Sequence, residues 1–208
     1  MGIINYSTFI ATATFFIMTP GIDTMFVLKK SIGEGKRSGM YSTLGINSGI
    51  ILHTILAAIG LSSMLIKYPM AFEVIKYLGA IYIIFMGFSS IISKEPMISL
   101  ESNSSKSSSK NNSFINGLIT NILNPKNAMF FLALFPQFIN QENLKDPFPF
   151  FQLGLTYALI GCIWYSLLTL FAGTFSTKIK ESPNADRWLK KLSGIVFIVL
   201  GLQLATGY

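Results

Sequence analysis

The stretch Thr19-Pro20-Gly21-Ile22-Asp23 interrupts an apolar segment near the N-terminus that is long enough to cross a bilayer as a helix. Proline removes a backbone hydrogen-bond donor and clashes with the preceding turn, and glycine adds backbone freedom. An acid at membrane depth is costly and usually marks a functional position. The stretch therefore predicts a broken membrane helix with a carboxylate at the break, an arrangement from which many transporters build a substrate site.

Composition favours a membrane protein. The 208 residues are 51% hydrophobic and 12% charged, whereas about 25% of the residues of a soluble domain are charged. The single cysteine, Cys162, excludes an internal disulfide, and with the single histidine, His53, it leaves too few ligands for a zinc or iron site. We therefore expect no metal and no cofactor. The net charge of +7 is attributed to basic loops that set membrane orientation, so we expect no nucleic-acid partner.

Six apolar segments are separable, and we expect each to form a transmembrane helix in an all-α integral membrane protein. They are residues 6–28, 39–66, 70–92, 114–138, 148–175 and 188–205. Residues 93–113 are polar and rich in serine, which predicts a flexible loop between the third and fourth segments. No basic region precedes the first segment, so we expect it to be retained and not removed as a signal peptide.

The distribution of lysine and arginine predicts the orientation. The loops after the first, third and fifth segments and their flanks hold Lys29, Lys30, Lys36, Arg37, Lys94, Lys106, Lys110, Lys178, Lys180, Arg187, Lys190 and Lys191. The opposite side has only Lys67, Lys76 and Lys145. We therefore expect the basic loops to lie in the cytoplasm and both termini to lie outside it.

The two halves of the chain, residues 1–92 and 114–208, resemble each other. Phe9 and Pro20 are separated by the same number of residues as Phe114 and Pro125. Because three spans is an odd number, two such halves lie in opposite orientations. The pattern predicts one transporter domain built from two inverted three-helix repeats, with the first and fourth helices broken and the site at the repeat interface near mid-membrane.

The counterpart of the first break is Asn121-Ile122-Leu123-Asn124-Pro125-Lys126-Asn127. It combines a second proline with several amides and a cation. An amino acid carries an ammonium and a carboxylate group, so Asp23 on one break and Lys126 on the other would suit it. Three alternatives stay open: a kink stabilised by Thr19 that binds no ligand, an Asp23 that pairs with a cytoplasmic lysine, and a direct Asp23–Lys126 ion pair.

Small residues recur at helical spacing in the second and fifth segments, which lets helices approach closely. The second segment carries Gly45, Gly49, His53, Ala57 and Gly60, and the fifth carries Gly154, Ala158 and Cys162, with Tyr157, Trp164 and Tyr165 nearby. The histidine either relays protons or is hydrogen-bonded within the helix packing. The aromatic side chains either line a cavity or serve packing.

With these residues identified, the chain resembles the lysine-exporter type family (LysE/RhtB) of small bacterial amino-acid exporters. The matching residues are Thr19-Pro20-Gly21-Ile22-Asp23, Leu28-Lys29-Lys30-Ser31, Gly45, Gly49, His53, Gly79-Ala80-Ile81-Tyr82, Met86-Gly87, Gly117-Leu118, Asn121, Asn124-Pro125-Lys126-Asn127, Phe130-Phe131, Pro136-Gln137-Phe138, Leu192-Ser193-Gly194 and Leu200-Gly201-Leu202. Ile22 departs from the family, whose members usually have a second proline there. The resemblance implies an exporter of amino acids or their derivatives in the bacterial inner membrane, driven by the proton motive force, and it permits a homodimer.

Taken together, the sequence predicts a secondary transporter and no enzyme. Asp23 is expected to bind the substrate amine or carry the coupling proton. Lys126, with Asn121 and Asn124, is expected to hold the carboxylate or exchange partners with Asp23. The further site residues are Thr19 and His53, and the hinges for alternating access are Pro20, Gly21 and Pro125.

Two other functions remain as alternatives. A small ion or metal permease of the same architecture would need several intramembrane acids or histidines, and only Asp23 and His53 are available. A scaffold or a transmembrane redox carrier is a membrane protein of another class, and the lack of paired cysteines argues against the redox carrier.

Overall fold

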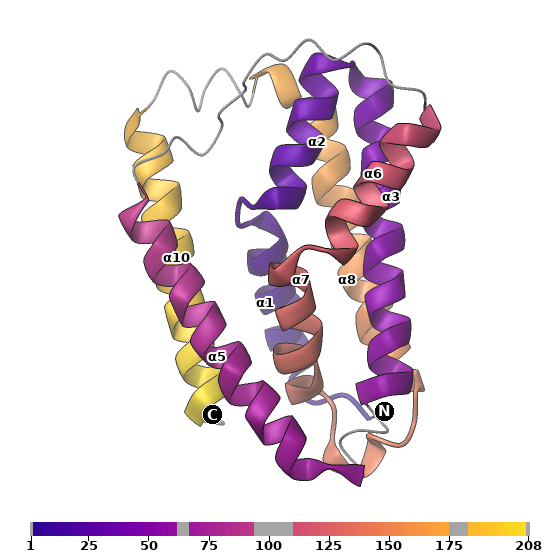
Figure 1. The fold of residues 1–208 in the computed structure, drawn as a ribbon, viewed down its shortest axis with the longest axis vertical. Coiled ribbons are helices and arrows are strands. Elements are labelled where there is room, and N and C mark those ends of the chain that lie inside the picture. The colour runs from indigo at the N-terminus through magenta and orange to yellow at the C-terminus, as the bar shows by residue number, and fades with distance from the viewer. Residues whose placement is uncertain (1, 62–66, 94–109, 175–182, 207–208) are drawn as a thin grey trace.

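The computed structural model describes residues 2–61, 67–93, 110–174 and 183–206, and these residues are almost entirely helical (Figure 1). The longer elements are α1 (Tyr6–Met18), α2 (Ile22–Gly33), α3 (Lys36–Leu56), α5 (Pro69–Ile92), α6 (Lys110–Ile122), α7 (Pro125–Met129), α8 (Phe148–Leu170) and α10 (Pro183–Thr206). Short turns of other helix types complete them: η1 (Ala57–Leu61), η2 (Phe130–Leu134), η3 (Phe135–Phe138) and η4 (Gln141–Asn143). Most of the expected serine-rich loop, residues 94–109, lies outside the described residues.

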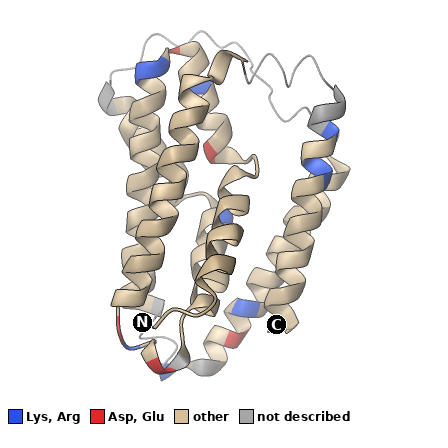
Figure 2. Cartoon of the chain, turned by 180° about the vertical axis from the view of Figure 1, so that it is seen from behind, with Lys and Arg blue, Asp and Glu red and all other residues tan. Residues whose placement is uncertain are grey.

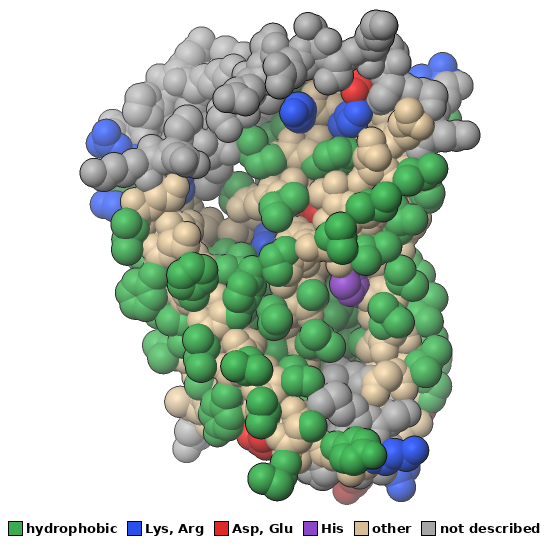
Figure 3. All heavy atoms as spheres, viewed as in Figure 1, with side chains coloured by type: hydrophobic (Ala, Val, Ile, Leu, Met, Phe, Trp, Pro, Cys, Tyr) green, Lys and Arg blue, Asp and Glu red, His purple; other side chains and the backbone are tan. Residues whose placement is uncertain are grey.

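In the described part of the chain, four helical stretches are long and apolar enough to cross a membrane. They are Lys36–Gly60, Met70–Ile92, Phe148–Leu170 and Arg187–Thr206. A fifth span results if α1 and α2, which are bent by 52° at their break, are taken as one. Charged residues gather toward the two ends of the helices (Figure 2), and apolar side chains cover most of the face between them (Figure 3). The protein is therefore a multi-pass membrane protein.

The break between α1 and α2 follows from the backbone chemistry of its residues. Thr19 and Gly21 adopt extended backbone conformations, and α2 begins again at Ile22. Pro20 has no N–H to donate to the preceding turn. The hydroxyl of Thr19 donates to the carbonyl oxygen of Phe15 at 2.8 Å, which closes the end of α1. The predicted break in the first segment is confirmed.

The break between α6 and α7 has a similar local cause. Pro125 occupies the first turn of α7, where a missing N–H costs nothing. Asn124 caps that helix, because its Oδ1 accepts from the backbone N–H of Lys126 at 3.0 Å. The predicted interruption in the fourth segment is therefore present. Two boundaries differ from expectation: α6 begins earlier, at Lys110, and the end of the segment tightens into η3 at Phe135–Phe138, which contains Pro136.

Glycines allow the helices to pack closely, as the stripe of small residues in the second segment predicts for Gly45. A Cβ atom on Gly45 of α3 would collide with the carbonyl oxygen of Phe114 in α6. In the second helix pair, a Cβ on Gly194 of α10 would stand 2.5 Å from the carbonyl oxygen of Gly87 in α5. Each pair thus joins one helix from each half of the chain: α3 with α6, and α5 with α10.

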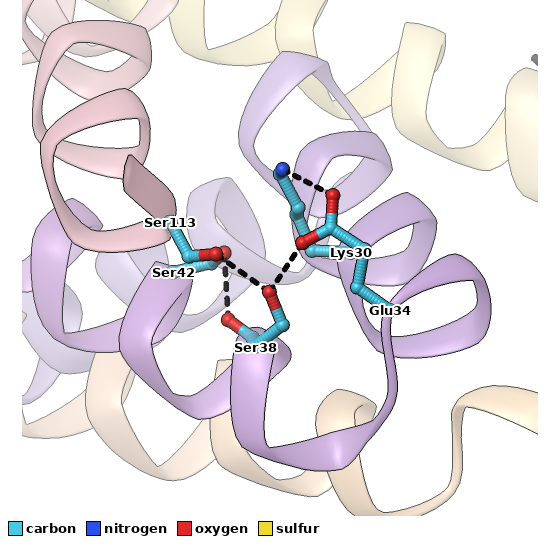
Figure 4. A network of polar contacts seen from close by, with 5 residues as sticks. All are labelled: Lys30, Glu34, Ser38, Ser42 and Ser113. Carbon is cyan, nitrogen blue, oxygen red and sulfur yellow. Dashed lines mark hydrogen bonds and ion pairs between the residues drawn. The ribbon is translucent and has the colours of Figure 1, made fainter. Parts of the chain in front are cut away.

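A network of hydrogen bonds and one ion pair connects α2, α3 and α6 at one end of the molecule (Figure 4). Lys30 and Glu34 form an ion pair at 2.6 Å, and Glu34 accepts from the hydroxyl of Ser38 at 2.7 Å. The hydroxyls of Ser38 and Ser113 are 2.6 Å apart, which joins α3 to the start of α6. Ser42 donates to the carbonyl oxygen of Ser38. The network holds the α2–α3 hairpin and α6 together.

The α5–α10 pair joins the other helices at a different place. α5 packs against η2 and α7, and the ring of Phe197 in α10 meets Phe16 of α1 edge to face, with centroids 5.3 Å apart. The buried interior there is aromatic, with contacts that link Phe9, Phe16, Phe130, Phe131, Phe135 and Tyr157. The two helix breaks lie beside this aromatic interior.

Candidate functional site

Asp23 stands in the first turn of α2 and is 3% exposed. Its Oδ2 accepts two hydrogen bonds, from Nδ2 of Asn121 at 2.9 Å and from Nδ2 of Asn127 at 2.7 Å. Asn121 precedes the second helix break and Asn127 follows it. The carboxylate of Asp23, at the first helix break, thus accepts hydrogen bonds from amides on both sides of the second helix break.

Lys126 occupies the corresponding position on α7 and is 6% exposed. Its Nζ donates to the carbonyl oxygen of Thr19 at 2.7 Å. That carbonyl lies at the end of α1, where the break removes the next turn of the helix. The rings of Phe16 and Phe197 lie 5.2 Å and 5.9 Å from Nζ, within the range of cation–π contacts. The ammonium group of Lys126, at the second helix break, is therefore bound to the backbone of the first helix break.

The two buried charges do not contact each other directly. Asp23 and Lys126 are not within the 4.0 Å of an ion pair, and each binds neutral groups from the opposite break. Burying a charge is costly unless partners compensate for it. Of the alternatives left open by the sequence, the direct Asp23–Lys126 pair is not formed in this structure. Oδ2 of Asp23 accepts from amides, and among the described residues no lysine forms an ion pair with Asp23.

His53 on α3 lies next to this arrangement but not on the carboxylate. Its Nε2 is 3.4 Å from the carbonyl oxygen of Asn121, and its ring stacks on Phe131 with centroids 5.4 Å apart. A Cβ on Gly49, one turn earlier in α3, would stand 2.5 Å from Oδ1 of Asn121. The stripe of small residues thus makes room for the amide that holds Asp23.

The structure brings together Asp23, Asn121, Lys126 and Thr19, with His53 at the edge. The side chain of Asn124 caps α7. Sequence reasoning did not select Asn127 as a site residue, although the motif contains it. In a continuous helix, the side chains of Asn121 and Asn127 would point about 120° apart, and the break lets both reach one carboxylate. The sequence feature that could have identified Asn127 was the concentration of asparagines around Pro125.

Known proteins resemble this chain over almost its whole length. The chain matches the family described as LysE type translocator over residues 14–207. An uncharacterized membrane protein YrhP from Bacillus subtilis is 32% identical, with 94% of this chain and 95% of the relative covered. A leucine efflux protein from Klebsiella pneumoniae is also 32% identical, with coverage of 99% and 96%. One from Enterobacter is 28% identical, with coverage of 99% and 97%.

No solved structure matches the chain. The family match extends across both helix breaks and nearly to the C-terminus, and the relatives are covered almost from end to end. Proteins of this family are translocators and not enzymes. The chain belongs to the LysE type translocator family.

Proposed function

We propose that this translocator exports neutral amino acids, with leucine as the first candidate, across the bacterial inner membrane in exchange for protons. The observation that carries the proposal is a buried acid and a buried base, one at each helix break, that are not paired with each other. A zwitterionic amino acid supplies a partner for both charges. The names of the leucine efflux relatives support this class of substrate.

The proposed binding mode follows from the hydrogen-bond partners of Asp23 and Lys126. The substrate carboxylate takes the place of the Thr19 carbonyl oxygen at Nζ of Lys126, because a hydrogen bond between two charged groups is stronger than one to a neutral carbonyl. The substrate ammonium binds Asp23 through Oδ1, since Oδ2 is occupied by Asn121 and Asn127. Protonation of Asp23 then releases the ammonium group and couples export to the proton gradient.

We also propose that six spans form two inverted repeats, with the α1–α2 pair and the α6–α7–η2 run as the broken helices. The pairing of α3 with α6 and of α5 with α10 supports this symmetry. Both termini lie at one end of the molecule (Figure 1), as an even number of spans requires. The basic residues support a cytoplasmic position for the opposite end. Pro20, Gly21 and Pro125 are the proposed hinges.

The test is pH-driven flux of labelled leucine in proteoliposomes that contain the purified protein. Asp23→Asn keeps the shape of the side chain and removes the titrating charge, so pH-driven flux is expected to be lost. The matched control is Asp146→Asn, an exposed acid before α8 whose capping Oδ1 the asparagine retains. Unchanged pH-driven flux in Asp23→Asn would contradict the proposal, and flux of metal cations in place of leucine would favour the permease alternative.

A further inference from the structure

A hollow of about 350 Å³ opens on the surface of the protein at the start of α3. The described residues that line it are Lys36, Arg37, Met40, Tyr41 and Leu44. Their spacing places them on one side of the helix, with the two basic side chains at its beginning. The hollow therefore lies at the end of the molecule opposite to the two termini (Figure 1). None of these residues belongs to the proposed transport site.

The hollow is on the side of α3 that the neighbouring helices leave uncovered. Elsewhere around the helix, Ser38 packs against α6 and Gly39 packs against α2. Met40 and Leu44, in contrast, are 38% and 49% exposed. In a protein that spans a membrane, an exposed apolar face of a helix contacts lipid. The apolar part of the hollow therefore faces the bilayer.

The position of the hollow along α3 corresponds to the membrane surface. The candidate membrane span that contains α3 begins at Lys36, so this residue and Arg37 lie at the level of the lipid headgroups. With a rise of 1.5 Å per residue, Met40 and Leu44 lie about 6 Å and about 12 Å further into the membrane. Tyr41, between them, is of a residue type enriched at membrane surfaces. The hollow thus extends from the headgroups to the beginning of the acyl chains.

The two positive charges at the mouth of the hollow are available to a ligand. Lys36 and Arg37 are exposed, and among the described residues neither forms an ion pair with an acid. Glu34, the nearest acid in the sequence, is bound to Lys30 and Ser38. A guanidinium group binds phosphate oxygens in a bidentate manner, and an ammonium group adds a point charge. The mouth of the hollow therefore suits a phosphate group.

We propose that this hollow binds one anionic phospholipid of the surrounding bilayer. The lipid phosphate contacts Lys36 and Arg37, and one acyl chain lies along Met40 and Leu44. A zwitterionic lipid fits less well, because its headgroup brings a second cation next to the two basic side chains. A small soluble phosphate compound has no chain for the apolar part of the hollow. The inference goes beyond the proposed function and holds for any transported substrate.

The test is native mass spectrometry of the purified full-length protein, titrated with lipids of matched acyl chains. Dioleoylphosphatidylglycerol is the anionic probe, and dioleoylphosphatidylcholine is its zwitterionic counterpart. The wild type is expected to bind the anionic lipid at least about tenfold more tightly than the zwitterionic one. Glycerol 3-phosphate, which has the headgroup phosphate without the chains, is expected not to displace the bound lipid.

Three double variants identify the site. Lys36→Gln with Arg37→Gln removes both charges at the mouth and is expected to weaken the anionic lipid by about tenfold or more, with no change for the zwitterionic lipid. Lys36→Arg with Arg37→Lys keeps both charges and is expected to retain binding. The matched control is Lys29→Gln with Arg187→Gln, which removes two exposed charges from α2 and α10 toward the same end of the molecule. It is expected to bind the anionic lipid as the wild type does.

Four results would overturn the inference. Equal affinity of the wild type for the two lipids shows that the headgroup charge is not recognised. Unchanged binding in Lys36→Gln with Arg37→Gln places the lipid elsewhere. An equal loss in the control variant shows a general effect of net charge. Displacement of the lipid by glycerol 3-phosphate identifies a site for soluble phosphate compounds. None of these results bears on the transport of leucine, so the proposed function is tested separately.

Discussion

Asn127→Ala is expected to destabilise the protein, because it removes one of the two donors to the buried carboxylate of Asp23. The bond is short, 2.7 Å, and Asp23 is 3% exposed, so water does not readily replace the lost amide. Hydrogen bonds to charged groups contribute about 1.5–3 kcal/mol. The free energy of unfolding, measured in mixed detergent micelles, is expected to fall by about that amount.

A double-mutant cycle shows whether the charge of Asp23 is the cause. In an Asp23→Asn background the bond joins two neutral groups, for which about 0.5–1.5 kcal/mol is typical. The loss caused by Asn127→Ala is therefore expected to shrink by about 1 kcal/mol. Asn116→Ala removes an exposed amide from α6 and serves as control, with an expected change within about 0.5 kcal/mol. Additive losses in the cycle, or a neutral Asn127→Ala, would refute the reasoning.

Two further changes test the packing around the site. Gly49→Ala places a Cβ 2.5 Å from Oδ1 of Asn121 and is expected to displace this amide and lower leucine flux. Gly60→Ala meets no atom of the described residues within 4 Å and is expected to leave the flux unchanged. Equal flux in both variants would contradict the close contact at Gly49. Ser38→Cys with Ser113→Cys, in a Cys162→Ser background, is expected to form a disulfide under mild oxidation, because the two hydroxyls are 2.6 Å apart, and failure to cross-link in membranes would show that α3 and α6 do not meet there.

The helix breaks were predictable because their causes are local. Pro20 and Pro125 lack a backbone donor wherever they stand in a chain, so a helix that contains them is expected to end or bend. The presence of an acid and a base in apolar surroundings also pointed to Asp23 and Lys126. These inferences needed no knowledge of which helices are neighbours.

The hydrogen-bond partners of Asp23 and Lys126 were harder to predict from the sequence, because they depend on contacts between segments that are distant in the chain. Asn124 was expected to help hold a carboxylate, and the structure adds a role that was not predicted: its Oδ1 caps α7, a use that the position before Pro125 favours. Asn127 reaches Asp23 only because two broken helices meet. Thr19 contributes its backbone carbonyl to Lys126, and its hydroxyl stays within α1.

The early start of α6, at Lys110, also depends on contacts with a segment that is distant in the chain. Residues 110–113 are polar, and their local sequence favours a loop. The hydroxyl of Ser113 nevertheless meets Ser38, and Phe114 packs its backbone against Gly45. Contacts with α3 stabilise the first turn of the helix more than local propensity opposes it.

The central claim is that a buried base at one break and a buried acid at the other bind a single zwitterion. It is tested most directly by counterflow of labelled leucine at equal pH on both sides of proteoliposomes, which requires binding but no proton gradient. Lys126→Gln is expected to exchange leucine at least about tenfold more slowly than the wild type, because the substrate carboxylate loses its charged partner. Lys145→Gln, at an exposed lysine, is expected to exchange leucine normally. Exchange by Lys126→Gln at the wild-type rate would contradict the account.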